Sequence, residues 1–573
     1  MGMETEVILL AAVGVLVLVA ATGLSRRIGV AAPLLLVAIG AGLSYLPGAP
    51  AIHLEAEWIL LIVLPPLLYG AAVAFPVIDF RRNLPPIAFL GVALVIISAV
   101  AVGWVLFIVF PDLDLASAIA LGAVLSPTDA VSATSIAKRI GLPSRIVTVL
   151  EGESLVNDAS ALVLLRTATA SIAAVFDLPA AVGSFFWATF AAIVVGAAVG
   201  ALAVFVRSRF KDPVMVTSIS FVIPFFAYAP AEAIDASGVI AVVTTGLIVG
   251  HYSVRSQTIQ LRFAEQTNWR TVQFILENGV FLLMGYQLRE YIDDDIHAGF
   301  QPGYTIAIGL LAVAVLVVVR LAFTFPLFAL LARRSRRIAA GRHSLWGMLS
   351  VRVRQRLVAL RHRGSDVDWR HQLKRRYESD RAFHAREALG WRSSAIIGWS
   401  GMRGVVTVAA VQSLPTDTPY RAALILIAFT AATATLLLGG LTLPSLARAL
   451  GVREAETAPG SDIRALFTEL ARTGREVLAD PELARPDGTP FSPDAVEQID
   501  GEIARQAHVA ERSLPSTPSG KQSAELQELR RQVFAAEREA LADARATSTF
   551  GSAALDTAEA ILNTIEAQTT ADG

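Results

Sequence analysis

The chain has 573 residues, of which 54% are apolar and only 17% are charged, whereas about a quarter of a soluble domain is charged. This composition argues against a disordered chain and against an ordinary cytosolic enzyme. The sequence contains no cysteine, which excludes disulfides, thiol catalysis and cysteine metal sites. A formal net charge of −1 gives no support to nucleic-acid binding. We therefore predict an integral membrane protein.

A helix needs about 20 mostly apolar residues to cross the hydrocarbon core of a membrane. Thirteen stretches of the chain meet this requirement in a reading of the sequence. In chain order they are 6–24, 29–47, 56–76, 84–110, 115–137, 145–171, 178–206, 213–231, 237–252, 271–289, 304–332, 394–414 and 420–441. The first stretch does not have the polarity of a cleaved signal peptide, because Glu4 and Glu6 precede it and Arg26 and Arg27 follow it.

The charges between the predicted spans indicate an orientation. Basic residues follow the odd-numbered spans: Arg26, Arg27, Arg81, Arg82, Lys138, Arg139, Arg207, Arg209, Lys211, Arg333, Arg334, Arg336 and Arg337. The opposite loops carry Asp112, Asp114, Asp177, Asp293, Asp294 and Asp295. Because lysine and arginine remain on the cytoplasmic side, we expect a multi-pass protein of the plasma (cell inner) membrane with its N-terminus outside and its C-terminus in the cytoplasm.

Two segments are predicted to lie outside the membrane. The loop 331–394 has 16 arginines and one lysine against five acidic residues, a formal charge of +12, and the tail after residue 451 has a formal charge of −10. We expect 1–450 to be the transmembrane domain and 451–573 to be a regulatory cytoplasmic tail, with a helix over 522–548 and a proline-rich loop before it. The tail either docks on the basic loop, or that loop binds anionic lipid head groups.

Ionisable and polar side chains at membrane depth are costly, so each of them is a candidate for a functional site. In this sequence they cluster in five of the predicted spans. They are Ser126-Pro127-Thr128-Asp129 in the fifth span, Glu151 to Asp158 in the sixth, Glu277-Asn278 in the tenth, Arg320 in the eleventh and Gly401-Met402-Arg403-Gly404 in the twelfth.

The sixth predicted span has the pattern of an ion site. In a helix, Ser154 and Asp158 are one turn apart on one face with Asn157 beside them, and Glu153 points about 140° away from Asp158. Hydroxyl, amide and carboxylate oxygens suit a small unhydrated cation. Pro127 in the fifth span is expected to free carbonyls of the preceding turn, which is tolerated at this depth where the helix faces protein or a water-filled cavity. We therefore predict a site shared by these two spans.

Two arginines at membrane depth need anionic partners, because an unpaired buried charge is strongly penalised. Arg403 is expected to pair with Glu153 in a structural ion pair, although a transport role for Arg403 stays open. The sequence does not identify the partner of Arg320. Glu151 and Glu277 lie closer to the ends of their spans and are expected to reach the membrane interface.

Several motifs in one order carry a resemblance to a known family. They are Leu64-Pro-Pro-Leu-Leu-Tyr69, Leu125-Ser-Pro-Thr-Asp129-Ala-Val, Glu151-Gly-Glu-Ser-Leu-Val-Asn157-Asp158-Ala-Ser-Ala-Leu-Val-Leu, Ser237-Gly-Val-Ile-Ala-Val-Val, Gly401-Met-Arg403-Gly-Val-Val and Gly440-Leu-Thr-Leu-Pro444. The run that begins at Glu151 resembles the signature span of the monovalent cation/proton antiporters of the first class, the NhaP-like and eukaryotic sodium/proton exchanger group. The resemblance covers about residues 6–450.

This resemblance implies an all-helical membrane fold with an inverted repeat, two discontinuous helices that cross, and a homodimer. It implies that Asp158 is the carboxylate that binds the cation and the proton. It further implies that the site is completed by Asp129, Ser154, Thr128 and the neutral Asn157, and that Glu153 and Arg403 form a buried stabilising pair. The chain departs from the family at Gly70, where many relatives have an acidic residue.

The expected function is exchange of a monovalent cation, most simply Na⁺, for H⁺, in support of pH and sodium homeostasis. Asp158 in a low-dielectric cavity can hold a proton or a cation, and binding of one displaces the other. Asn157 adds no second charge, which favours electroneutral one-for-one exchange. No cofactor is expected besides the transported ions, and membrane lipids but no nucleic acid are expected partners.

Three alternatives were weighed against Na⁺/H⁺ exchange. K⁺/H⁺ exchange on the same scaffold stays open, and a cation channel without proton coupling is a further alternative. An intramembrane aspartyl protease would need Gly-Asp pairs that the acidic spans lack. The sequence also has no HExxH, GxSxG or P-loop pattern.

Overall fold

The computed structural model describes residues 3–28, 30–47, 58–171, 178–256, 259–339, 389–415, 418–452, 458–481, 483–485, 488–509, 524–547, 550–551, 554–555 and 557–562. These residues are almost entirely helical and contain no strand beyond one isolated bridge between Ala484 and Pro490. They belong to two compact units, Met1–Ala332 with Leu389–Arg453, and Arg333–Ala388 with Glu454–Gly573. The all-helical class predicted from the sequence is confirmed.

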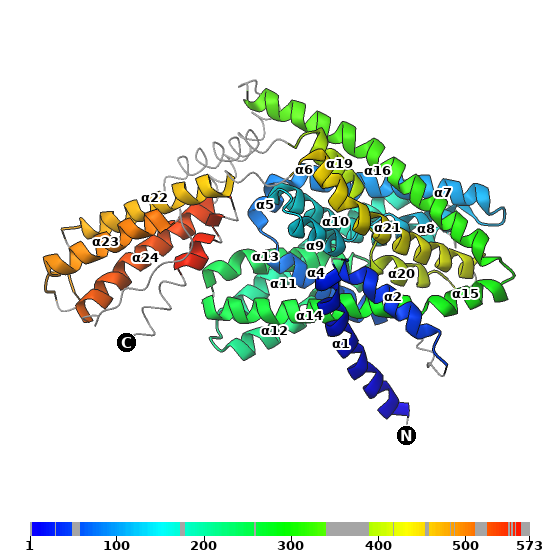
Figure 1. Ribbon diagram of the computed structural model, residues 1–573, viewed down its shortest axis with the longest axis horizontal. Coiled ribbons are helices and arrows are strands. Elements are labelled where there is room, and N and C mark those ends of the chain that lie inside the picture. The colour runs from blue at the N-terminus through cyan, green and yellow to red at the C-terminus, as the bar shows by residue number, and fades with distance from the viewer. Residues whose placement is uncertain are drawn as a thin grey trace. The chain divides into compact units, whose positions relative to one another are not determined.

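The helices up to Leu450 follow one another along the chain, and Figure 1 labels the α-helices among them. They are α1 (Met3–Ile28), α2 (Ala32–Ser44), η1 (Ile59–Val63), α4 (Leu64–Ala74), α5 (Val77–Arg82), α6 (Leu84–Ala88), η2 (Phe89–Ala93), α7 (Leu94–Val109), α8 (Leu115–Leu125), α9 (Ala130–Arg139), α10 (Ser144–Ala170), α11 (Leu178–Arg207), α12 (Pro213–Glu232), α13 (Gly238–Ser256), α14 (Ile259–Tyr286), α15 (Leu288–His297), α16 (Pro302–Ala339), α19 (Trp391–Trp399), α20 (Val405–Gln412) and α21 (Arg421–Leu450).

Each predicted span coincides with a helix or with consecutive helices, and two spans are split. The span predicted at 115–137 is α8 followed by α9, and the span predicted at 394–414 is α19 followed by α20. Among the described residues, five stretches are long and apolar enough to cross a membrane alone: 84–109, 182–207, 213–232, 302–333 and 421–450. Shorter apolar helices supply further segments, and the number of thirteen crossings stays a prediction.

One predicted boundary is wrong by three helical turns. The tenth span was expected to begin at residue 271, but α14 begins at Ile259. Its first turns carry Glu265, which forms a buried salt bridge with Arg207 of α11. A search for apolar stretches misses such a segment, because the charge is neutralised by a residue that is distant in the sequence.

Small residues let the helices of the first unit approach closely. A Cβ atom on Gly122 of α8 would collide with the carbonyl oxygen of Ala99 on α7, and one on Gly285 of α14 would collide with that of Val37 on α2. Such small-residue contacts are typical of helices packed within a membrane. The packing surrounds α10, which contacts α8, α9, α11 and α13 and lies in the middle of this unit (Figure 1).

The second unit contains α22 (Ala458–Leu478), α23 (Pro493–Val509) and α24 (Ala524–Thr547). The helix predicted over 522–548 is confirmed as α24, whereas α22 and α23 were not predicted. The three helices share an apolar core formed by Ala471, Phe491, Ala495, Ile499, Ile503, Leu526, Leu529 and Val533. Most of the predicted basic loop, residues 340–388, lies outside the described residues.

Candidate functional site

Two interrupted helices cross inside the first unit. The chain is not helical between α8 and α9 around Thr128 and between α19 and α20 around Met402. The backbone N–H of Asp129 donates a hydrogen bond to the carbonyl oxygen of Met402 at 2.7 Å, so the two interruptions meet. A Cβ atom on Gly404 would lie only 2.7 Å from Cβ of Asp129, and glycine therefore permits this close crossing. The break at Pro127 that the sequence predicted is part of this arrangement.

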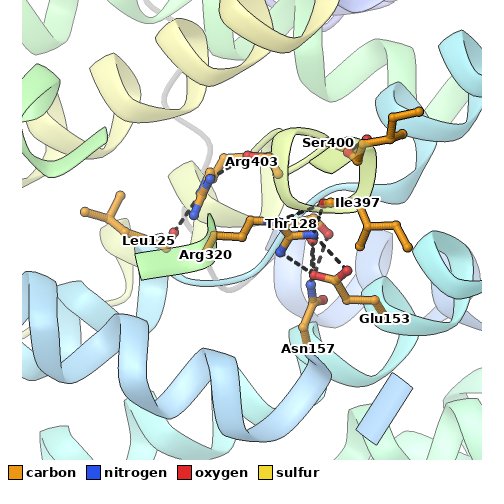
Figure 2. Close-up of polar contacts among 10 residues, drawn as sticks. Leu125, Thr128, Glu153, Asn157, Arg320, Ile397, Ser400 and Arg403 are labelled. Atoms are coloured by element: carbon orange, nitrogen blue, oxygen red, sulfur yellow. Dashed lines mark hydrogen bonds and ion pairs between the residues drawn. The ribbon is translucent and has the colours of Figure 1, made fainter. Parts of the chain in front are cut away.

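Arg403 satisfies the carbonyl groups that the interruptions expose. Helix ends leave their last carbonyls without partners within the helix. The Nε of Arg403 donates to the oxygen of Leu125, the last residue of α8, at 3.1 Å, and its Nη1 donates to the oxygen of Gly401 at 2.5 Å (Figure 2). A cation at a helix C-terminus also interacts favourably with the helix dipole. The arginine thus stabilises the crossing from within.

The partner of Glu153 is Arg320 of α16, and the expected pair with Arg403 is wrong. Nη1 and Nη2 of Arg320 donate to the two carboxylate oxygens of Glu153 at 2.5 and 2.9 Å (Figure 2). The two side chains are 3% and 1% exposed, respectively. Arg320 also donates to the carbonyl oxygen of Ile397. The guanidinium of Arg403 donates to carbonyl oxygens instead. Arg320, whose partner the sequence did not identify, is therefore the bidentate partner of the Glu153 carboxylate.

A chain of hydrogen bonds links this ion pair to the interrupted helix. The hydroxyl of Thr128 donates to Oε1 of Glu153 at 3.0 Å. The side-chain amide of Asn157 donates to that hydroxyl at 2.9 Å and to the carbonyl oxygen of Thr128 at 3.3 Å. Asn157 and Glu153 of α10 thus hold the extended residues of the other helix in place (Figure 2).

A cavity of about 590 Å³ lies on the other side of α10. Of the site residues predicted from the sequence, Thr128, Asp129, Ser154 and Asp158 line this cavity. Asn157 does not line it, is 1% exposed and faces Thr128 instead. The expectation that hydroxyl, amide and carboxylate project from one patch is therefore corrected: the amide belongs to the network, and the hydroxyl and carboxylate belong to the cavity.

The two aspartates of the cavity differ in their surroundings. Asp129 precedes α9, and its Oδ2 accepts hydrogen bonds from the hydroxyl of Ser132 at 2.7 Å and from its backbone N–H at 3.2 Å. Asp158 is 9% exposed, and its carboxylate accepts no hydrogen bond from any described residue. The two negative charges repel each other across the cavity. Asp158 is thus a buried carboxylate without a protein donor.

The cavity also contains polar residues to which the sequence assigned no role in the site. Glu277, expected at the membrane interface, lines the cavity, as do Gln273 and Arg270. Their spacing of three and four residues places them on one face of α14, and this spacing was the signal that could have grouped them. Glu151 also lines the cavity, and it forms a salt bridge with Lys138 of α9 at 2.8 Å.

The departure at Gly70 has a local structural basis. A Cβ atom on Gly70 would lie 3.0 Å from Cδ and Nε2 of Gln273 and 3.0 Å from the indole of Trp269. The amide of Gln273 in turn donates to the carbonyl oxygen of Leu67 at 3.4 Å. The space for a larger side chain at position 70 is therefore occupied from α14.

Comparisons with known proteins identify the family of the chain. The family model described as "Sodium/hydrogen exchanger, transmembrane" matches residues 14–449. An uncharacterized Na⁺/H⁺ exchanger of Mycobacterium tuberculosis is 29% identical over 516 residues, which are 88% of this chain and 84% of that protein. The Na⁺/H⁺ antiporter ApNhaP of Aphanothece halophytica is 27% identical over 422 residues, 73% of this chain and 69% of that protein.

Two further comparisons concern ion choice and fold. A Bacillus subtilis protein named as a sodium, potassium, lithium and rubidium/H⁺ antiporter is 31% identical over 268 residues, 45% of this chain and 40% of that protein. The solved structure of the sodium proton antiporter MjNhaP1 from Methanocaldococcus jannaschii matches with a TM-score of 0.55 at 14% identity. That match covers 78% of this chain and 99% of the other, and it shows a shared fold.

Proposed function

Because the chain belongs to the sodium/hydrogen exchanger family, we propose that it exchanges Na⁺ for H⁺ one for one, with Asp158 as the carboxylate that carries either ion. Members of this family are secondary transporters and not enzymes. Cation/proton exchange by a multi-pass membrane protein is thus the general activity. Ion preference, stoichiometry and the identity of the carrier group are the proposed refinements.

The observation that carries the proposal is the isolation of the Asp158 carboxylate. It is buried, faces the cavity, and accepts no hydrogen bond from the described residues. An uncompensated buried charge costs several kcal/mol. A proton or a cation removes that cost, and because both bind to the same carboxylate, binding of one displaces the other. If the loaded forms reorient and the empty anion does not, transport of the two ions is coupled.

The cation ligands would be hard oxygen atoms from two helices. Asp158 and Ser154 come from α10, and Thr128 and Asp129 come from the interruption before α9. Such donors suit Na⁺ or K⁺. Ser132 holds the Asp129 carboxylate at the start of α9 with two hydrogen bonds, whereas Asp158 has no such donor among the described residues, so we assign the exchanged proton to Asp158 alone. Asn157 lies outside the cavity and adds no charge, which supports electroneutral exchange.

Alternating access would follow from movement of the helices that carry these ligands against the remaining helices. We further propose an N-terminus outside, a C-terminus in the cytoplasm of the inner membrane, and a homodimer. The tail 451–573 would be regulatory, by docking on the basic loop 331–394 or by competing with lipid for it. The cellular role would be pH and sodium homeostasis.

K⁺/H⁺ exchange is the second candidate function. The Bacillus subtilis relative, by its name, accepts sodium, potassium, lithium and rubidium. Oxygen ligands on two separate helices can adapt to cations of different size, which is consistent with either preference.

The test uses the purified full chain in proteoliposomes with a pH-sensitive dye inside. Addition of Na⁺ should move protons in the opposite direction, with smaller responses to K⁺ and Li⁺, and Asp158→Asn should reduce the response to that of protein-free vesicles. Under one-for-one exchange, a valinomycin-imposed membrane potential should change neither the rate nor the end-point. Substantial exchange by Asp158→Asn would remove this residue from the central role, and cation conduction without proton movement would indicate a channel.

A further inference from the structure

The cavity contains a third carboxylate that the proposed exchange cycle does not use. Glu277 lies on α14, a helix that packs chiefly against α2, α4 and α12, whereas Asp158 and Asp129 belong to α10 and to the interruption before α9. Glu277 is half-buried, and its carboxylate accepts no hydrogen bond from any described residue. It is close enough to Asp129 for the two negative charges to repel each other.

No basic residue of the cavity wall neutralises Glu277. Lys138 is paired with Glu151 at 2.8 Å. Arg270 lies seven residues before Glu277 on the same helix, about 10 Å away along its axis, and its side chain is exposed. The neighbouring Asn278 turns its amide to the carbonyl oxygen of Phe274 at 2.8 Å and away from the carboxylate. Among the described residues, Glu277 thus has no basic partner in the cavity wall.

The charges of the lining residues make the whole cavity attractive to cations. Asp129, Glu151, Asp158 and Glu277 face two basic residues, Lys138 and Arg270, so the formal charge of the lining is −2. A cleft lined by one sign of charge with low-dielectric walls concentrates counter-ions. A second observation points to a ligand in the same space: Asp158 is more than nine-tenths buried, faces the cavity and accepts no hydrogen bond from the described chain.

We propose that Glu277 forms a staging site at which a hydrated monovalent cation is held before it reaches Asp158 and Asp129. The proposal rests on the proposed exchange function and assigns a separate role to α14 within it. A cation at Glu277 would offset the repulsion between this carboxylate and Asp129, and it would raise the local cation concentration next to the carrier group. Glu277 would therefore set the apparent affinity for the cation without taking part in proton exchange.

The test compares the Na⁺ dependence of proton flux for full-length variants in proteoliposomes. Glu277→Gln should raise KM for Na⁺ about fivefold or more while kcat changes less than about twofold. It should also weaken the dependence of KM on ionic strength between about 10 and 300 mM, because screening acts on the removed charge. Glu277→Asp keeps the charge and should stay near the wild-type KM, which controls for folding.

Two further variants serve as controls. One should change KM less than Glu277→Gln does, and the other should lower KM. Glu151→Gln makes the same chemical change in the same cavity, but the carboxylate it removes belongs to a solvent-exposed pair with Lys138, so KM should rise clearly less than in Glu277→Gln. Arg270→Gln removes a positive charge without a carboxylate partner in the described structure and should lower KM. An unchanged KM in Glu277→Gln, or equal increases in Glu277→Gln and Glu151→Gln, would overturn the staging site.

A binding measurement separates this inference from the carrier role of Asp158. In an Asp158→Asn background, which cannot exchange, binding of radioactive Na⁺ to the detergent-solubilised protein should persist weakly and should be lost on adding Glu277→Gln. Equal binding with and without Glu277→Gln would contradict the staging site. Exchange that is independent of voltage in wild type and dependent on voltage in Glu277→Gln would also contradict the staging site. Such a change would mean that Glu277 carries a transported charge. Absence of exchange in wild type would instead refute the function proposed above.

Discussion

The polar network at the crossing and the wall of the cavity are less than two turns apart on α10, and each contains one buried carboxylate. The two carboxylates differ in whether the protein supplies hydrogen-bond donors to them. Glu153 accepts hydrogen bonds from Arg320 and Thr128, so the protein itself neutralises it. Asp158, five residues later, has no donor among the described residues. The difference indicates that the network stabilises the two interrupted helices, whereas the cavity leaves one charge for a mobile ion to neutralise.

The largest effects should come from Glu153 and Asp158: substitution of Glu153 should lower stability, and substitution of Asp158 should abolish transport. Glu153→Gln strands the guanidinium of Arg320 and should lower the free energy of unfolding by about 3–5 kcal/mol. Asp158→Asn removes a charge without a protein partner, so stability should be unchanged or higher while exchange is lost. Chemical unfolding in detergent, followed by tryptophan fluorescence, measures both variants. A large loss of stability in Asp158→Asn would mean that its carboxylate has a structural partner after all.

The next effect concerns which arginine is coupled to Glu153. Glu153→Gln and Arg320→Gln should each destabilise by several kcal/mol, and the double variant should lose clearly less than the sum because neither charge is then stranded. Arg403→Gln should be closer to additive with Glu153→Gln, since Arg403 donates to the carbonyls of Leu125 and Gly401. Thermal unfolding of the single and double variants gives the two coupling energies. A stronger coupling to Arg403 would contradict the observed pairing.

The second unit contains a buried carboxylate that can be compared with Glu153 and Asp158. Glu537 of α24 is 1% exposed, its Oε2 has no hydrogen-bond partner in the described structure, and burial raises its pKa from 4.5 to about 8. Its Oε1 would lie 3.1 Å from a Cβ atom placed on Gly474 of α22, so the side chain is packed between helices.

The folded state therefore binds a proton on Glu537 that the unfolded state releases near pH 4.5. The contribution of Glu537 to the stability of this helical unit should be largest below about pH 4.5 and should be lost as the pH rises through about 8, by up to a few kcal/mol. Hydrogen exchange of the full chain at pH 6 and pH 9, corrected for intrinsic rates, should show lower protection of α22 and α24 at the higher pH. Glu537→Gln should remove that change, and an equal change in this variant would assign it to other groups.

The smallest effect should come from the hydroxyl that joins the network to the interrupted helix. Thr128→Val keeps the shape but removes the donor to Glu153 and the acceptor for Asn157, which should cost about 1–3 kcal/mol. Thr128→Ser retains the hydroxyl and should cost less. Melting temperatures of the two variants in detergent measure the difference, and equal losses would assign the effect to packing of the methyl group.

Much of this protein could be predicted from local sequence patterns. Apolar stretches of about 20 residues identified the membrane class and coincide with the helices, because crossing a bilayer constrains each segment on its own. Pro127 marked the interruption before α9, since a proline removes a backbone donor wherever it stands. The spacing of Ser154 and Asp158 correctly placed both on the cavity wall, because helical periodicity decides which residues share a face.

Only the tertiary structure decided which side chains meet across helices. Periodicity shows that Glu153 points away from the cavity side of α10, but it shows neither that Arg320 lies there nor that Asn157 turns from the cavity toward Thr128. Arg403 and Arg320 are equally unusual at membrane depth, and the sequence cannot choose between them, because their partners are carbonyls and carboxylates distant in the chain. The sequence likewise predicts Glu277 near a helix end. In the structure α14 begins at Ile259, so Glu277 lies well inside the helix, and it lines the cavity. Helix positions follow from local hydrophobicity, whereas charge pairing depends on the packing of several helices at once.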